Sequence, residues 1–244
     1  MSMVRANGLD LHTEEVAPIG AHRGTVVLIH GMTSDNMASW YLTLAHPLAQ
    51  AGLRVLLYDL RGHGHSARPG TGYTLDDFVA DLEALLAHWD PGGPVHLFGN
   101  SFGGTVAFAY AARHPSAVAG IVTLESAPPT PAWFDRMTRR LSTVPTLPDS
   151  RRVRAASALL AETSIGTELP ASALPDPAAY AAVNCPVLCL YGGDSAVKQL
   201  AGETGRLLPR SRHVVIEGQK HTLLIDAPDQ VRAEVLPWLA APSI

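Results

Sequence analysis

Short apolar runs alternate with longer stretches of helical periodicity along most of the chain. The apolar runs are short and most end at glycine or at a polar residue, which is typical of strands buried on both faces. The sequence predicts six such strands, at residues 25–31, 54–64, 95–100, 119–126, 187–194 and 213–218.

Helical patterns fall between these strands, and Thr74 or Asp76 is positioned to cap the second of them. Strands that alternate with helices indicate an α/β fold, with a mostly parallel, eight-stranded type of sheet and helices on both faces. The first twenty residues are expected to add one or two antiparallel edge strands. The predicted helices cover residues 37–50, 74–89, 102–113, 196–207 and 229–239.

One interval, from about residue 127 to 184, contains no convincing strand. It opens with "PPTP", closes with "LPDPAAYAAVNCP", and is rich in Arg and Ala between them. Because a structureless loop of that length is uncommon, we expect a small helical cap insertion at 127–183, with residues 1–126 and 184–244 forming the core. The alternative is a set of ordinary crossover helices with long connections.

Composition narrows the class of protein only slightly. The 244 residues carry a formal charge of −4, which suits one globular domain and gives no reason to expect a nucleic acid partner. The opening "MSMVRANGLDLHTEE" lacks the apolar core of a signal peptide, and no apolar run could span a membrane, so we expect a cytoplasmic protein. Cys185 and Cys189 lie four residues apart on a predicted strand, roughly 13 Å apart, and are expected to be buried free thiols.

The most informative stretch is "VHLFGNSFGG", where Ser101 stands between Gly99 and Gly103. It fits G-x-S-x-G between a strand and a helix, a turn that exposes a nucleophilic serine. The turn is tight, so the residues two positions away must be small. The helix N-terminus behind Ser101 favours the negative charge that develops in the reaction. Ser101 could instead be only a helix N-cap.

A serine nucleophile needs a base and an orienting carboxylate. His221 in "EGQKHTLLIDAP" follows the sixth strand and is the best candidate for the base. Asp194 in "YGGDS" follows the fifth strand and gives the order Ser…Asp…His. Glu125, at the end of the fourth strand, is the rival acid or else a substrate contact.

An oxyanion requires two hydrogen-bond donors. The backbone N–H of Phe102, directly after the nucleophile, is one candidate. The N–H of Met32, in the loop after the first strand, is the other. His30 is expected to hold this loop, and it is also a candidate for the substrate pocket.

With these residues assembled, the chain resembles the α/β-hydrolase fold superfamily over nearly its whole length. The resemblance rests on His30-Gly31, "YDLRGHGHSARP", "GNSFGG", "YGGDS" and "GQKHTLLIDAP", in that order. It implies Ser101 as nucleophile, Asp194 as acid and His221 as base, with an oxyanion hole at Met32 and Phe102.

The resemblance also bears on cofactors. In the family the pattern that contains His63 and His65 shapes a structural turn, which argues against a metal pair. No cofactor and no metal are expected.

The expected function is cleavage of a carboxylic ester or thioester through an acyl-enzyme on Ser101. "GNSFGG" also resembles the elbow of hydrolases that cleave carbon–carbon bonds in ring-opened diketo acids, so a carbon–carbon hydrolase or lyase is the alternative. A non-catalytic ligand receptor on the same scaffold is a third possibility.

The interval 127–183 offers two clues to the substrate. Trp133, Phe134 and Met137 suggest an apolar pocket lining. Six arginines and one acidic residue fall between positions 136 and 154, which is either a solvated helical face or a surface that attracts an anionic or carrier-bound acyl substrate. The expected partner is a small-molecule acyl substrate, with no nucleic acid and no membrane.

Overall fold

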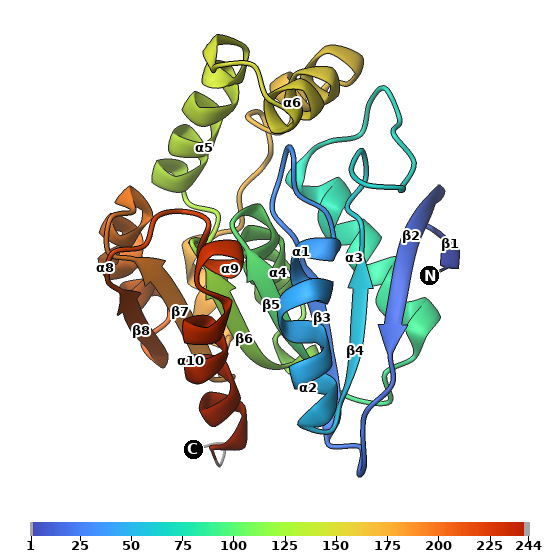
Figure 1. Ribbon diagram of the computed structural model, residues 1–244, viewed down its shortest axis with the longest axis vertical. Coiled ribbons are helices and arrows are strands. Elements are labelled where there is room, and N and C mark those ends of the chain that lie inside the picture. The colour runs from blue at the N-terminus through green and yellow to red at the C-terminus, as the bar shows by residue number, and fades with distance from the viewer. Residues whose placement is uncertain (1, 242–244) are drawn as a thin grey trace.

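The computed structural model describes residues 2–241 and contains an eight-stranded sheet with helices on both faces (Figure 1). The spatial order of the strands is β1-β2-β4-β3-β5-β6-β7-β8. The strands are β1 (Ser2–Ala6), β2 (Leu9–Val16), β3 (Gly24–Ile29), β4 (Leu53–Tyr58), β5 (Val95–Asn100), β6 (Val118–Leu124), β7 (Val187–Gly192) and β8 (Ser211–Ile216).

All six strands that the apolar runs predict are present. In β3, Val26 and Leu28 face one layer of helices and Val27 and Ile29 face the other, and all four are fully buried. Burial on both faces explains why these strands are continuous apolar runs rather than alternating ones.

The edge strands also confirm the prediction. β1 pairs with β2 and β2 pairs with β4 in antiparallel register, whereas β4, β3, β5, β6, β7 and β8 are parallel throughout. The carboxyl ends of the six parallel strands therefore lie at one edge of the sheet, where ligand chemistry gathers in open α/β folds.

One face of the sheet is covered by α3, α4 and α8, and the other by α1, α2, α9 and α10 (Figure 1). Thr74 caps α3 in a reciprocal capping box with Asp77. No helix of the described residues is long and apolar enough to cross a membrane. The helical segments are α1 (Ala38–Trp40), η1 (Tyr41–Ala45), α2 (His46–Gln50), α3 (Leu75–Trp89), α4 (Phe102–Arg113), η2 (Pro115–Ala117), α5 (Pro131–Thr143), η3 (Val144–Thr146), α6 (Arg151–Glu162), α7 (Ile165–Glu168), η4 (Pro177–Ala182), η5 (Ala196–Leu200), α8 (Ala201–Leu207), α9 (Leu223–Asp226) and α10 (Pro228–Ala240).

Between β6 and β7 the structure has helical segments and connecting loops only, and we refer to residues 131–162, from α5 through η3 to α6, as the cap. Figure 1 shows α5 and α6 above the carboxyl ends of the strands. α5 is attached to the core because Trp133 Nε1 donates a hydrogen bond to Thr105 Oγ1 of α4 (2.6 Å). Farther along, Glu168 accepts hydrogen bonds from the backbone N–H groups of Gly72 and Tyr73. The domain bounds at 127 and 183 stay a prediction.

Both cysteines are free and buried, as expected. Burial raises the pKa of each thiol to about 11. The thiols therefore remain protonated near neutral pH, which suits a packing role.

Candidate active site

Ser101 stands on a sharp turn between β5 and α4. Its backbone has φ 50° and ψ −117°, a conformation that a residue with a side chain rarely adopts. A Cβ atom at Gly99 would lie 2.2 Å from the nitrogen of Gly104, and one at Gly103 would lie 2.2 Å from the carbonyl oxygen of Ile29. The two glycines of the motif are therefore a steric condition for this turn.

His221, in the loop between β8 and α9, connects Ser101 to a carboxylate. Its Nε2 lies 3.1 Å from Ser101 Oγ, and its Nδ1 lies 2.9 Å from Glu125 Oε2. An ionised carboxylate only accepts hydrogen bonds, so Nδ1 carries the ring proton and Nε2 is free to accept the proton of the serine hydroxyl. This is the tautomer that a general base requires.

Glu125 is fully buried, directly after β6, and adopts a positive φ of 54°. Its Oε1 accepts the backbone N–H of Gly192 (2.6 Å), and its Oε2 accepts the hydroxyl of Ser195 as well as the His221 ring. Three donors offset the cost of burying this carboxylate. Sequence reasoning missed Ser195, although it stands in "YGGDS", because a single serine beside Asp194 forms no recognisable motif.

The expected pairing of Asp194 with His221 is corrected by this geometry. Asp194 is exposed, and its backbone N–H donates to the carbonyl oxygen of Gln219 (2.9 Å). β6 and β7 are adjacent parallel strands, so both acids follow strands that end at the same edge of the sheet. Glu125 is the residue that reaches the imidazole.

The two expected oxyanion donors lie at the same place. Met32 and Phe102 both line the cavity that contains Ser101. Phe102 is the first residue of α4, so its N–H has no partner within the helix. The Met32 N–H has no acceptor in the part of the chain that the structure describes. A donor role for these two groups stays a prediction.

Hydrogen bonds to the side chains of His63 and Asp35 hold the loop that carries Met32. Thr33 has a positive φ of 73°, and its N–H donates to Nε2 of His63 (2.9 Å). Burial, together with the nearby His30, lowers the pKa of His63 to about 3, so its ring is neutral and can accept this bond. Asp35 accepts the N–H of Gly31 (2.7 Å). Neither Asp35 nor His63 carried a sequence signal for this role.

His30 is fully buried and does not line the cavity, which corrects its place among the pocket candidates. Its Nε2 accepts the N–H of Leu60 (2.9 Å), and its Nδ1 donates to the carbonyl oxygen of Gly31 (2.6 Å). It holds the loop after β3 against the loop after β4.

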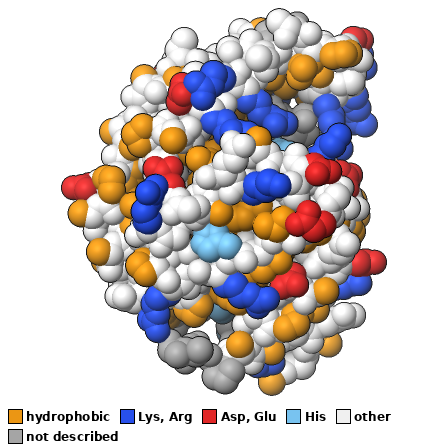
Figure 2. Space-filling model, turned by 90° about the vertical axis from the view of Figure 1, so that its left-hand side faces the viewer, with side chains coloured by type: hydrophobic (Ala, Val, Ile, Leu, Met, Phe, Trp, Pro, Cys, Tyr) orange, Lys and Arg blue, Asp and Glu red, His pale blue; other side chains and the backbone are white. Residues whose placement is uncertain are grey.

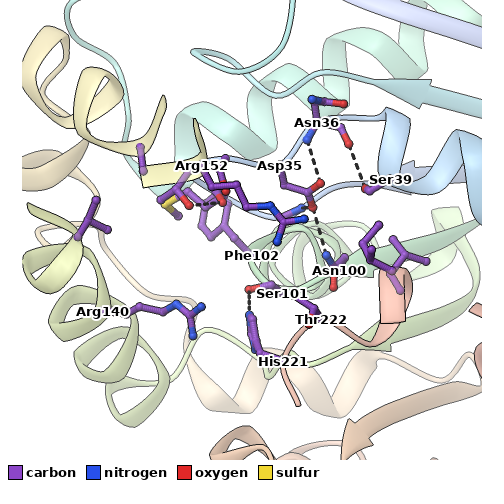
Figure 3. A pocket seen from close by; sticks show the side chains of 18 of the residues that line it. Asp35, Asn36, Ser39, Asn100, Ser101, Phe102, Arg140, Arg152, His221 and Thr222 are labelled. Carbon is purple, nitrogen blue, oxygen red and sulfur yellow. Dashed lines mark hydrogen bonds between the residues drawn. The ribbon is translucent and has the colours of Figure 1, made fainter. Parts of the chain in front are cut away.

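Ser101 and His221 line a cavity of about 580 Å³ between the sheet edge and the cap (Figure 3). Its walls come from the loop after β3, the elbow, the cap and the segment after β8. The cap contributes Met137, Arg140, Leu141, Val144, Leu147, Ser150, Arg152, Val153 and Ala156.

Three further pocket candidates lie outside the cavity wall. Trp133 and Phe134 are buried at the base of the cap, where α5 meets the core, and Glu125 is buried behind His221. Met137 does line the cavity. Trp133 instead attaches α5 to the core through its hydrogen bond to Thr105. Among residues 2–241, no group of His, Cys, Asp or Glu side chains is arranged to hold a metal ion.

A mostly parallel sheet carries a strained serine at its centre; the serine is hydrogen-bonded to a histidine, and the histidine to a buried glutamate. This arrangement defines the class of α/β proteins with a nucleophile elbow. The chain belongs to the α/β-hydrolase fold family, whose model matches residues 24–152, just over half of the chain.

Several known proteins are similar to it. Lipase LipV of Mycobacterium tuberculosis is 40% identical over 121 residues, which cover 49% of this chain and 42% of the lipase. The non-heme chloroperoxidase of Streptomyces lividans is 41% identical over 78 residues, covering 32% of this chain and 28% of that protein. The chain thus spans less than half the length of these relatives. The crystal structure of the enol-lactonase from Burkholderia xenovorans LB400 has a TM-score of 0.78 at 19% identity, covering 98% of this chain and all of that one.

Proposed function

We propose that this protein is a serine hydrolase that cleaves a carboxylic ester or thioester through an acyl-enzyme on Ser101. The observation that carries the proposal is the continuous hydrogen-bonded chain Ser101–His221–Glu125, whose serine and histidine line the cavity. Similarity to a lipase supports an ester as the substrate.

The first half of the reaction forms the acyl-enzyme. Ser101 Oγ attacks the carbonyl carbon while its proton moves to His221 Nε2. Glu125 holds the Nδ1 proton and stabilises the imidazolium. The N–H groups of Met32 and Phe102 bind the oxyanion of the tetrahedral intermediate. When this intermediate collapses, His221 returns the proton to the leaving oxygen or sulfur.

The second half releases the acid. His221 takes a proton from a water molecule that attacks the acyl carbon, and the same two N–H groups bind the second oxyanion. The proton then returns to Ser101 Oγ, and the free carboxylic acid leaves. The acid–base chemistry is thus carried by His221 alone, with Glu125 in an orienting role.

The test compares wild type with Ser101→Ala on a panel of aryl esters, lactones, acyl thioesters and vinylogous diketo acids. We expect a loss of at least about 10⁴-fold in kcat for Ser101→Ala. A fluorophosphonate probe should label Ser101 in wild type only, and mass spectrometry should trap an acyl-enzyme with an aryl ester. A wild-type protein that the probe fails to label would contradict the proposal and favour a ligand receptor. Turnover confined to diketo acids would favour carbon–carbon cleavage.

A further inference from the structure

Two arginines from different cap helices border the cavity that contains Ser101. Arg140 lies in the last turn of α5, and Arg152 lies in the first turn of α6. Figure 3 shows Arg140 and Arg152 extending into the cavity from opposite sides of the cap. Neither guanidinium has an ion pair or a hydrogen bond to any residue that the structure describes.

Two other cap arginines show the opposite arrangement. Arg139, next to Arg140 on α5, forms an ion pair with Asp135 one turn earlier. Arg154, two residues after Arg152 on α6, pairs with Asp149 (2.7 Å). Both lie outside the cavity wall. Arg136 and Arg151 also lie outside the cavity wall, and neither has an ion pair among the described residues. Among the described cap residues, Arg140 and Arg152 are therefore the arginines that both line the cavity and lack an ion pair.

The rest of the wall does not supply a counter-charge to these two arginines. Asp35 is the single acidic side chain among the described residues that line the cavity. Figure 3 shows Arg152 reaching towards it, but no ion pair joins them. The Asp35 oxygens already accept the N–H groups of Gly31 and Asn36 and the side-chain amide of Asn100. The cavity mouth is consequently positive, and the N-terminus of α6 adds to this potential.

Apolar side chains line the same cavity as the two arginines and Ser101. Met137 and Leu141 lie four residues apart on α5, as the spacing of one helix face requires, and Val144 directly follows this helix. The ligand that fits this lining combines an apolar chain with an anionic group. Figure 2 shows blue basic side chains gathered in the upper part of the molecule, the part that the cap forms.

We propose that Arg140 and Arg152 form an anion subsite, and that the preferred substrate is an ester or thioester whose apolar chain carries a carboxylate or phosphate. This inference rests on the proposed function, because it assigns a substrate class to the same cavity. Guanidinium groups pair with both anions through charge-assisted hydrogen bonds, so the two anions share the recognition chemistry.

The experiment compares two esters of equal length, 4-nitrophenyl hydrogen adipate, which ends in a carboxylate, and its neutral methyl ester. At low salt we expect wild type to prefer the anionic ester by at least about tenfold in kcat/KM. The preference should shrink at about 0.5 M NaCl, where exposed charges are screened over a few ångströms. Equal rates for both esters would overturn the subsite and leave the serine hydrolase intact. Absence of Ser101-dependent turnover of either ester would instead contradict the proposed function.

Matched double variants assign the preference to the two residues. Arg140→Gln with Arg152→Gln should bring the ratio of the two kcat/KM values close to one. Arg139→Gln with Arg154→Gln removes the same charge from the same two helices and should retain the wild-type ratio. An equal fall in both double variants would overturn the subsite, because it would show a general field of the cap rather than a specific contact.

Competitive inhibition identifies the anion. Hexanoate and hexyl phosphate are compared as inhibitors of the neutral ester. Arg140→Gln with Arg152→Gln should weaken by at least about tenfold the inhibitor whose head group the subsite binds. If neither inhibitor is weakened, the subsite is overturned.

Discussion

Glu125 Oε2 lies 2.9 Å from His221 Nδ1, and the two residues come from segments 96 positions apart in the chain. The carboxylate is fully buried, whereas the Asp194 side chain is exposed. A buried, fully hydrogen-bonded carboxylate keeps the imidazole in one orientation, which an exposed and solvated carboxylate does less well.

Substitutions of Glu125 and Asp194 should therefore have different effects on kcat. Glu125→Gln keeps the side-chain length but favours the wrong imidazole tautomer, because the amide can donate where the carboxylate only accepts. We expect kcat to fall by about 10³–10⁴-fold. Asp194→Asn, the matched control, should stay within about twofold of wild type, because its side chain contacts none of the reacting groups. Steady-state kinetics on an aryl ester measures both. A greater loss in Asp194→Asn than in Glu125→Gln would contradict the assignment.

Most of the fold follows from local patterns. Strands buried on both faces are continuous apolar runs, and the elbow is defined by glycines whose spacing has a steric cause. Ser101 and His221 could be found because each follows a recognisable strand, and the structure joins them at 3.1 Å.

The choice between Glu125 and Asp194 could not be made in this way. Both follow neighbouring strands and both satisfy the chain order. Which acid bonds the His221 ring depends on the backbone turn at Glu125. It also depends on the hydrogen-bond donors that Gly192 and Ser195 supply from β7 and the segment after it. These are tertiary contacts, and no local pattern encodes them.

The sequence pattern likewise does not predict which cap arginines form ion pairs. Arg139 and Arg140 are neighbours of the same type, yet one pairs with Asp135 and the other faces the cavity. Helix rotation separates adjacent residues by about 100°. Which side faces the cavity is set by how α5 docks, and Trp133 fixes that docking through Thr105.

Ser195 is a positioning residue for Glu125, the acid of the proposed mechanism. Its hydroxyl donates to Glu125 Oε2, so Ser195→Ala should loosen the carboxylate without touching the substrate. A hydrogen bond to a charged group contributes about 1.5–3 kcal/mol, so we expect kcat to fall by roughly tenfold or more. KM should stay close to the wild-type value, which distinguishes lost positioning from lost binding.

The control for this experiment is Ser126→Ala. Ser126 is also buried and directly follows Glu125, but its hydroxyl has no hydrogen-bond partner among the described residues. Its removal should leave kcat within about twofold of wild type. A loss in Ser126→Ala that equals the loss in Ser195→Ala would mean that any change of packing near Glu125 lowers kcat.

Gly103→Ala tests the steric condition of the elbow. The new methyl group would lie 2.2 Å from the Ile29 carbonyl oxygen, which belongs to the backbone of a central strand and cannot move away freely. We expect the free energy of unfolding to fall by at least about 2 kcal/mol, together with loss of activity. Gly93→Ala, where a Cβ atom would meet nothing within 4 Å, should change it by less than about 1 kcal/mol. Urea unfolding measures both, and equal stability of the two variants would refute the packing argument.

The half-buried His96 makes the stability of the fold depend on pH. Burial lowers the pKa of His96 to about 4, and its ring packs edge-on against Trp238. The unfolded chain takes up a proton near the usual histidine pKa of about 6.5, whereas the folded protein resists protonation until about 4. The unfolded state therefore binds more protons between these values, and stability decreases as the pH falls through this window.

His96→Phe should remove part of this dependence, because it keeps an aromatic ring against Trp238 but cannot be protonated. Between about pH 7 and pH 5.5, we expect the free energy of unfolding of wild type to fall by about 1 kcal/mol more than that of His96→Phe. His88→Gln changes an exposed histidine and should retain the full wild-type slope. Urea unfolding at both pH values measures the three proteins. Parallel slopes for wild type and His96→Phe would show that protonation of His96 is not coupled to unfolding.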